Sequence, residues 1–264
     1  MHFPPKILPG IGSLIRKRLI ARIDVKNEYA IKGIQLEGLR KVGDPKAMAK
    51  KYYDAGADEI LFMDAVAAYY DRNSLSELIA FATDNVFIPI TVGGGIRTIE
   101  DIQTALNSGA DKVSINTQAI KNLDFIREAS RIYGSQCIVA SVDAKRIEDD
   151  WYAYYDNGRE SSGLNVKQWC QSLQDAGAGE LLLTSVDRDG TKEGFDEELI
   201  DSLGNSIDIP MILSGGAGSV EHINTVIEHK YVDAVAVASV LHYKIHSMSE
   251  LKSSPYLSSS ESRV

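Results

Sequence analysis

The stretch IPITVGGGIRTIEDI, at residues 88–102, recurs as IPMILSGGAGSVEHI at residues 209–223. A second pair, AGADEILFMD at residues 55–64 and AGAGELLLTS at residues 176–185, has the same offset of 121 positions (209 − 88 and 176 − 55). The first pair joins a short apolar run to a glycine-rich turn and a helical pattern. The chain therefore contains two copies of one structural unit, and we expect a fold built from two similar halves.

Eight apolar runs predict strands, and helical patterns lie between them. Six of the runs show no polar alternation, which is typical of parallel strands covered on both faces. Residues 44–55 and 99–108 predict helices; the first opens with an Asp cap and Pro, and both are followed by Gly. The runs are Leu19–Val25, Glu59–Ala65, Ile88–Gly94, Lys112–Asn116, Cys137–Ala144, Glu180–Val186, Ile209–Gly216 and Ala234–Ser239.

Strand and helix alternate eight times over roughly 240 residues, which is typical of a (β/α)8 barrel. A doubly wound parallel sheet shows a similar alternation, and the internal repeat decides between the two folds. The predicted class is therefore α/β, with a (β/α)8 TIM barrel built from two homologous half-barrels.

One barrel domain is predicted at residues 14–252, between an N-terminal extension and a C-terminal tail. Residues 1–13 form the extension, since three prolines and two glycines cannot sustain a helix or strand. Residues 253–264 are half serine and predict a flexible, solvated tail. No linker is recognised between these ends.

Composition narrows the class of function. The 264 residues are 44% hydrophobic and carry a formal net charge of −9, which disfavours a nucleic-acid partner because phosphate backbones are bound by basic surface. Only two cysteines occur, with no secretory pattern and no apolar run near 18 residues. We expect a cytoplasmic protein that binds neither nucleic acid nor membranes.

Two predicted strands end in a carboxylate. IVASVDAKR, residues 138–146, delivers Asp143, and LIARIDVK, residues 19–26, delivers Asp24. The two acids are 119 positions apart (143 − 24), close to the offset of the repeat. Two half-barrels closed face to face place them on opposite sides of the barrel mouth, where active sites of this fold lie. The sequence therefore predicts a two-carboxylate site.

The repeat also predicts two phosphate-binding loops. Gly93–Gly95 follow one strand and precede a helix, and Gly215, Gly216 and Gly218 do the same in the second half. Glycine lets backbone N–H groups close around an anion, and a helix N-terminus adds a favourable dipole. A tight turn without a ligand explains either loop alone. Two symmetry-related loops predict a substrate with a phosphate at each end.

Several motifs together resemble one family. They are DVK at Asp24, VGGGIR at Val92, GADKVSINT at Gly109, YGSQCIV at Tyr133, DAKR at Asp143, GAGELLLTSVDRDGTKEG at Gly177 and SGGAG at Ser214. Over about residues 17–252 the chain resembles the cyclase subunit of imidazole glycerol phosphate synthase of histidine biosynthesis. An isomerase of the same pathway shares the fold and the binding of a substrate with two phosphates, but DRDGTKEG and SINT match the cyclase.

The resemblance implies a reaction of ammonia with a bis-phosphorylated ribulosyl formimino carboxamide ribonucleotide. The products are imidazole glycerol phosphate and an aminoimidazole carboxamide ribonucleotide, and no cofactor or metal is implied. Asp24 and Asp143 match the acid and base, and carboxylates in different environments can differ in protonation. Substrate and phosphate binding are implied for Lys32, in the loop after the first strand, and for Gly94, Asn116, Thr117, Thr184, Asp189, Gly190, Ser214, Gly216, Ala238 and Ser239.

Ammonia is expected from a partner protein. Neither Cys137 nor Cys170 lies in a nucleophile-elbow pattern such as G-x-C-x-G, so the chain is not expected to hydrolyse glutamine itself. The resemblance implies a heterodimer with a glutaminase and entry of ammonia at the opposite barrel end. Asp111 matches a position at the partner interface. An ammonia gate, or simply a structural ion-pair network, is implied for Arg18, Glu59, Lys112 and Glu180.

The departures from the family cluster near Asp24. Arg22 replaces a small residue and should point into the barrel beneath Asp24, because residues two apart on a strand share a face. A buried guanidinium must be paired, either with Asp24 or with the charged ring. Other differences are Glu28, Gln35, Leu36, Gly38, Val66 and Ala68.

These departures leave two hypotheses. The chain is a working cyclase, or it is a cyclase-like paralogue that passes ammonia from a glutaminase to a third enzyme of surface-glycan or amidino-sugar biosynthesis.

Overall fold

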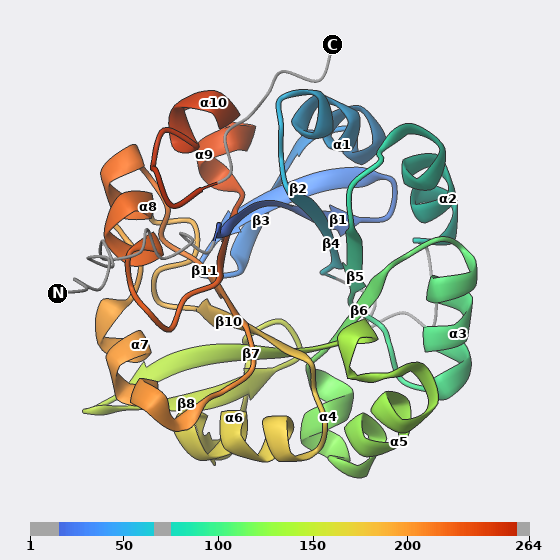
Figure 1. The fold of residues 1–264 in the computed structure, drawn as a ribbon, viewed down its shortest axis with the longest axis vertical. Coiled ribbons are helices and arrows are strands. Elements are labelled where there is room, and N and C mark those ends of the chain that lie inside the picture. Colours follow the sequence, from blue (N-terminus) through green and yellow to red (C-terminus); the bar gives the residue numbers. More distant parts are fainter. Residues whose placement is uncertain (1–15, 66–74, 258–264) are drawn as a thin grey trace, which may run out of the picture.

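The computed structural model describes residues 16–65 and 75–257 (Figure 1). The predicted extension at residues 1–13, residues 258–264 of the predicted tail, and the departures Val66 and Ala68 lie outside the described residues.

In the described residues, eight parallel strands close into a barrel, which confirms the predicted fold. Closure is seen in the register: β1 pairs with β12 on one side and β4 on the other, and β7 pairs with β10. The eight strands, in order around the barrel, are β1 (Arg18–Lys26), β4 (Glu59–Asp64), β5 (Ile90–Gly93), β6 (Lys112–Ile115), β7 (Ile138–Ile147), β10 (Glu180–Ser185), β11 (Met211–Ser214) and β12 (Ala234–Val237).

Helices form the outer ring (Figure 1). Local signals fix where they begin: the Asp44 side chain accepts a hydrogen bond from Lys46 N before the first helix, and Thr98 and Asp101 form a capping box before the third. The α-helices are α1 (Pro45–Asp54), α2 (Ser76–Asn85), α3 (Ile99–Asn107), α4 (Thr117–Lys121), α5 (Asp124–Tyr133), α6 (Val166–Asp175), α7 (Glu197–Leu203), α8 (Val220–Ile227), α9 (Ser239–His242) and α10 (Met248–Leu251). Short 3-10 turns lie at Ser135–Cys137 and Gly204–Ser206.

Two antiparallel hairpins extend the strands that carry the paired acids. β2 (Tyr29–Ile34) and β3 (Glu37–Gly43) follow β1, while β8 (Asp150–Tyr155) and β9 (Glu160–Asn165) follow β7. The expectation that Lys32 lies in a loop is wrong, since it lies in β2 and pairs with Arg40 of β3. The hairpins occupy equivalent places in the two halves, each directly after the strand that carries an acid.

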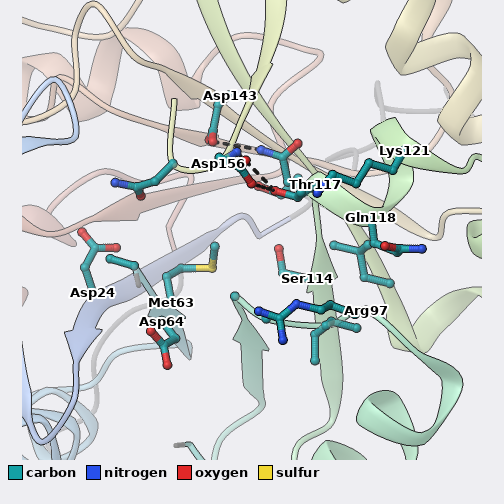
Figure 2. A pocket seen from close by; sticks show the side chains of 18 of the residues that line it. Asp24, Met63, Asp64, Arg97, Ser114, Thr117, Gln118, Lys121, Asp143 and Asp156 are labelled. Carbon is teal, nitrogen blue, oxygen red and sulfur yellow. Dashed lines mark hydrogen bonds between the residues drawn. The ribbon is translucent and has the colours of Figure 1, made fainter. Parts of the chain in front are cut away.

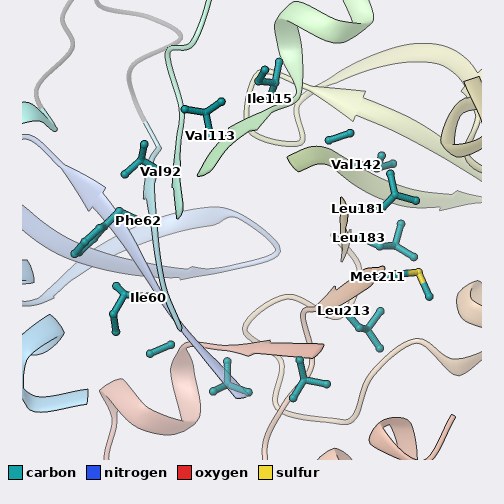
Figure 3. Close-up of a cluster of buried hydrophobic side chains, with 14 of the residues drawn as sticks. Ile60, Phe62, Val92, Val113, Ile115, Val142, Leu181, Leu183, Met211 and Leu213 are labelled. Carbon is teal, nitrogen blue, oxygen red and sulfur yellow. The ribbon is translucent and has the colours of Figure 1, made fainter. Parts of the chain in front are cut away.

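The core has an outer and an inner part because successive strand residues face opposite sides. Figure 3 shows part of the outer layer, where Ile60, Phe62, Leu181 and Leu183 lie between the strands and the helices. Leu61, between Ile60 and Phe62, instead faces the barrel interior. The inner cluster comprises Ile20, Leu61, Val139, Leu182, Ile212, Ala234 and Ala236, all at most 2% exposed.

Part of the predicted tail packs against the barrel. Lys17 N donates a hydrogen bond of 2.8 Å to Tyr256 O, and Lys17 forms a parallel bridge with Leu257. The Ser254 and Leu257 side chains are buried. Residues 253–257 therefore belong to the folded body. None of the helices in the described ranges is long and apolar enough to cross a membrane.

Candidate active site

The two carboxylates face each other across the barrel mouth. Asp24 lies near the C-terminal end of β1 and Asp143 on β7, which is four strands away in the closed order of eight. Both are buried, with 5% and 8% of their surface exposed. The structure therefore brings together the two acids that the sequence predicts to form one site.

Arg22 is paired directly with Asp24. Its Nε donates a hydrogen bond of 2.8 Å to Asp24 Oδ1, while Nη1 donates to Thr184 Oγ1 at 3.2 Å and to Ser214 Oγ at 3.1 Å. The side chain therefore crosses the interior from β1 to β10 and β11. The alternative that Arg22 joins the charged ring at the other barrel end is wrong, because its hydrogen bonds all lie at the mouth.

A second cation reaches Asp24 from the first hairpin. Lys32 Nζ lies 3.2 Å from Asp24 Oδ2 and donates to both carboxylate oxygens of Asp189, at 2.8 and 2.9 Å. Lys32 is only 2% exposed. Burial alone favours neutral Asp24, but Arg22 and Lys32 outweigh it and hold the pKa of Asp24 well below its usual range. Asp24 is therefore an anion at neutral pH.

Asp143 has a different environment. Asn116 Nδ2 donates to its Oδ2 at 2.9 Å and to Tyr154 O at 3.1 Å, which fixes the carboxyl group against the second hairpin. Burial raises the pKa of Asp143 to about 6, although Arg22 and the hydrogen bond from Asn116 favour the ionised form. One acid of the pair can therefore hold a proton near neutrality while the other cannot.

The main cavity of the site, at the barrel mouth, has a volume of about 120 Å³ and reaches both acids. Figure 2 shows Asp24 at one side of it and Asp143 near Thr117 at another. Gly94 lines this cavity with φ +90, and a Cβ there would lie 2.2 Å from Asp64 O, so only glycine fits. Gly94 of the first predicted phosphate loop therefore lies beside Asn116 and Thr117, which the resemblance also assigns to substrate and phosphate binding, with the cations Arg97 and Lys121 nearby.

The second predicted phosphate site is almost filled. Its cavity has a volume of about 10 Å³, roughly the space of one water molecule. A Cβ on Gly190 would lie 2.3 Å from Gly33 O, so the first hairpin sits directly on this loop. The cavity is lined by the predicted residues Lys32, Asp189, Gly190, Ser214, Gly216, Ala238 and Ser239. Thr184, the remaining predicted residue, is bonded to Arg22 instead.

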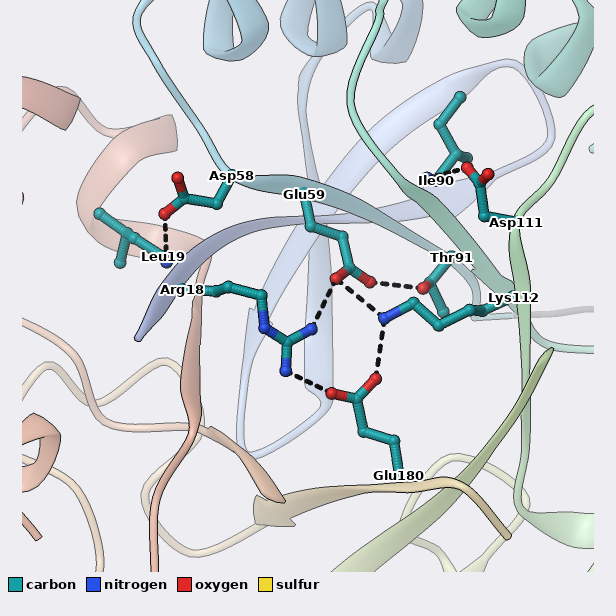
Figure 4. Close-up of polar contacts among 9 residues, drawn as sticks. All are labelled: Arg18, Leu19, Asp58, Glu59, Ile90, Thr91, Asp111, Lys112 and Glu180. Carbon is teal, nitrogen blue, oxygen red and sulfur yellow. Dashed lines mark hydrogen bonds and ion pairs between the residues drawn. The ribbon is translucent and has the colours of Figure 1, made fainter. Parts of the chain in front are cut away.

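Four charged residues close the opposite end of the barrel. This floor ring consists of Arg18, Glu59, Lys112 and Glu180, each the first residue of its strand (Figure 4). Each cation contacts both carboxylates: Arg18 binds Glu59 at 3.0 Å and Glu180, while Lys112 binds them at 3.0 and 2.8 Å. The ring residues of the predicted gate therefore form one ion-pair network, separated from the mouth by the inner apolar cluster.

Other residues differ from or add to the sequence predictions. Asp111 Oδ2 accepts a 2.8 Å hydrogen bond from Ile90 N, so the predicted interface residue also fixes the start of β5. Thr91 donates to Glu59 and supports the floor ring, a role that the sequence did not reveal.

Ser141 lines the main cavity and was also missed by the sequence analysis. It lies 119 positions after Arg22 (141 − 22), so the repeat offset identifies it as the counterpart of Arg22.

Comparisons with known proteins agree with the motifs. A family model described as "Histidine biosynthesis protein" matches residues 18–247. The "Imidazole glycerol phosphate synthase subunit HisF" of Legionella pneumophila is 51% identical over 208 residues, which cover 78% of this chain and 98% of that protein. The resemblance based on the motifs is thereby confirmed. The chain belongs to the histidine biosynthesis protein family and is a homologue of the HisF subunit of imidazole glycerol phosphate synthase.

Proposed function

We propose that this chain is a cyclase that combines ammonia with a bis-phosphorylated ribulosyl formimino carboxamide ribonucleotide. The products are imidazole glycerol phosphate and an aminoimidazole carboxamide ribonucleotide. The observation that carries the proposal is the pair Asp24 and Asp143, which flank one cavity and differ in protonation. Homology to the HisF subunit supports the same reaction.

Asp143 moves the protons in this proposal. With a pKa of about 6 it can both donate and accept near neutrality, and Asn116 holds it in place. Asp24 stays ionised between Arg22 and Lys32, so it stabilises the positive charge that develops on the attacking nitrogen. The two acids therefore act as a proton carrier and as a fixed anion.

The two ends of the substrate occupy the two glycine loops. One phosphate binds beside Gly94, Asn116 and Thr117, where the main cavity is open. The other binds near Gly216 and Ser239, where a cavity of about 10 Å³ requires the first hairpin to move away first. Lys32 holds that hairpin in place, because its Nζ donates hydrogen bonds to both Asp24 and Asp189.

Ammonia is supplied by a glutaminase that binds at the floor of the barrel as a heterodimer. The floor ring controls entry there, since Arg18 and Lys112 close the opening only through ion pairs with Glu59 and Glu180. Asp111 lies at this end and contributes to the partner interface.

A second function is favoured by the contacts of Asp24. Arg22 and Lys32 neutralise it and the second phosphate loop is nearly filled, which suits a paralogue that has lost cyclisation. Such a chain would pass ammonia from the glutaminase to a third enzyme. It would then share the family fold and partner but not the reaction.

Isotope labelling separates the two functions. The isolated folded chain is incubated with the bis-phosphorylated substrate and excess ¹⁵N-ammonium chloride, at neutral and at alkaline pH, and the products are analysed by mass spectrometry. A cyclase gives imidazole glycerol phosphate with one ¹⁵N atom and an unlabelled aminoimidazole carboxamide ribonucleotide. Unchanged substrate with circular dichroism of a folded barrel refutes the cyclase and supports the ammonia conduit.

A further inference from the structure

The guanidinium of Arg22 is only partly used by the protein. Three of its five N–H donors are engaged: Nε with Asp24, and Nη1 with Thr184 and Ser214. Among the described residues, none accepts a hydrogen bond from Nη2. Arg22 is 4% exposed and lines the main cavity, so its remaining surface faces the ligand space.

The engaged donors hold this group rigidly. Contacts to β1, β10 and β11 fix the guanidinium plane before any ligand binds, which lowers the cost of using its free donors. Ala236 of β12, a small inward-facing residue, lies between β1 and β11 and pairs with Ser214. Nη2 is therefore a preorganised pair of donors at the base of the site.

Neighbouring groups in the cavity also lack partners. Ser114 Oγ is buried, 2% exposed, and makes no hydrogen bond to the described residues. Ser114 and Ser141 lie on β6 and β7, across the cavity from Arg22. Hydroxyl groups together with the N–H donors of Arg22 can surround an acceptor oxygen.

The net charge of the ion-pair cluster that contains Arg22 indicates which kind of acceptor fits beside it. Arg22 and Lys32 contribute two positive charges, and Asp24 and Asp189 contribute two negative charges. With Asp143 protonated the sum is zero. A neutral carbonyl oxygen therefore fits better than an extra anion, because it accepts the free donors without unbalancing the buried charges.

We propose that Arg22 is a catalytic residue whose Nη2 donates hydrogen bonds to the substrate carbonyl oxygen at the carbon that ammonia attacks. The inference rests on the ammonia addition of the proposed function. In this proposal Arg22 is the hydrogen-bond donor to the developing oxyanion. The equivalent position in the second half of the barrel is Ser141.

The step balances without an outside reagent. The ammonia lone pair forms the new C–N bond, and the carbonyl π pair moves to oxygen, where Arg22 stabilises the charge. Protonated Asp143 gives its proton to that oxygen. The resulting carboxylate then takes a proton from the new ammonium nitrogen, which leaves a neutral carbinolamine and restores Asp143.

Kinetics of the Arg22→Lys variant test this role. Lysine keeps a cation beside Asp24 but lacks the Nη2 donors. With free ammonium as nitrogen source, kcat is expected to fall about 10²–10³-fold, with a much smaller change in KM for the substrate. The matched control Arg127→Lys, at an exposed position of α5, should keep the wild-type kcat. An Arg22→Lys enzyme with wild-type kcat overturns the proposal.

A binding measurement distinguishes failure of this inference from failure of the cyclase function. Ribulose 5-phosphate carries a ketone and a phosphate, whereas ribitol 5-phosphate lacks the ketone. NMR of ¹⁵N-arginine-labelled protein is expected to show a shift of the Arg22 guanidinium signal with ribulose 5-phosphate only. Arg22→Lys should weaken binding of the ketone about tenfold and leave the alcohol unaffected.

The two measurements have separate outcomes. If wild-type protein does not turn over the bis-phosphorylated substrate, the cyclase proposal fails, and a ketone-specific Arg22 shift still supports carbonyl recognition. Equal shifts with both ligands, or none with either, overturn the assignment of Arg22 whether or not the enzyme is active.

Discussion

Arg22 Nε lies 2.8 Å from Asp24 Oδ1, two residues further along the same strand and facing the same side. Its counterpart in the second half, Ser141, cannot make such an ion pair with Asp143. The internal repeat therefore provides two similar acids, and Arg22 together with Lys32 makes their protonation unequal. The asymmetry explains why Asp143 rather than Asp24 is the proton carrier in the proposed reaction.

Asp143 should titrate near neutrality. Burial sets its pKa to about 6, and the positive charge of Arg22 keeps that pKa from rising further. In Arg22→Met the pKa of Asp143 should therefore increase. Carboxyl ¹³C NMR of the labelled protein measures both values. A wild-type titration near pH 4, or a decrease in Arg22→Met, contradicts this electrostatic description.

Folding stability should depend on the protonation of Asp143. Its folded pKa of about 6 lies above the ordinary value of 3.8, so its contribution is complete below about pH 4 and is lost as the pH rises through 6. Between pH 4 and pH 8 the unfolding free energy should fall by up to about 3 kcal/mol more in wild type than in Asp143→Asn. Urea unfolding at both pH values measures the difference. Asp124→Asn, an exposed control, should follow wild type.

Loss of a floor-ring cation should reduce turnover with glutamine much more than turnover with free ammonium. Lys112→Met removes one cation, but Arg18 still contacts both carboxylates, so we expect a loss of about 1–3 kcal/mol in unfolding free energy. Turnover with free ammonium should remain within about threefold of wild type, because the mouth is unchanged. Turnover with glutamine and the partner glutaminase should fall about tenfold or more. Equal losses with both sources contradict a gating role.

The first hairpin should depend on Lys32. Lys32→Met leaves the buried Asp189 carboxylate without its cation, which should cost about 3–5 kcal/mol in unfolding free energy. Lys26→Met, at the exposed last residue of β1 just before the hairpin, is the matched control and should change the unfolding free energy little. Urea unfolding of both variants measures the effect. A Lys32→Met protein as stable as the control would show that the Lys32 contacts do not hold the hairpin.

The strands were predictable because their residues satisfy two apolar layers at once. Ile60, Leu61 and Phe62 are all apolar since alternate side chains face the helices and the barrel interior. The repeat then placed Asp24 and Asp143 at equivalent strand ends. Both of these signals are local or periodic, so they can be recognised without coordinates.

The first hairpin could not be predicted, because its turn lacks the usual turn residues. Its turn places Gln35 and Leu36 at φ 51 and 61, where Asn-Gly or Asp-Gly is the usual signal. The burial of Leu257 was likewise hidden by the serines around it. These features are held by tertiary contacts, which the local sequence does not encode.

The partner of Arg22 also required the structure. Strand alternation places Arg18 and Arg22 on the same face, and a long side chain can reach toward either end of the barrel. The Arg22 side chain turns toward the mouth because Thr184 of β10 and Ser214 of β11 accept hydrogen bonds from its Nη1. Those residues lie 162 and 192 positions away in the sequence.

The most direct test of the proposed reaction is the kcat of the isolated chain for the bis-phosphorylated substrate with free ammonium, measured for wild type, Asp143→Asn and Asp124→Asn. Wild type and Asp124→Asn should be equally active, and Asp143→Asn should lose about 10²–10⁴-fold because its proton carrier is gone. Folded wild-type protein without turnover, or an Asp143→Asn variant with wild-type kcat, would contradict the assignment.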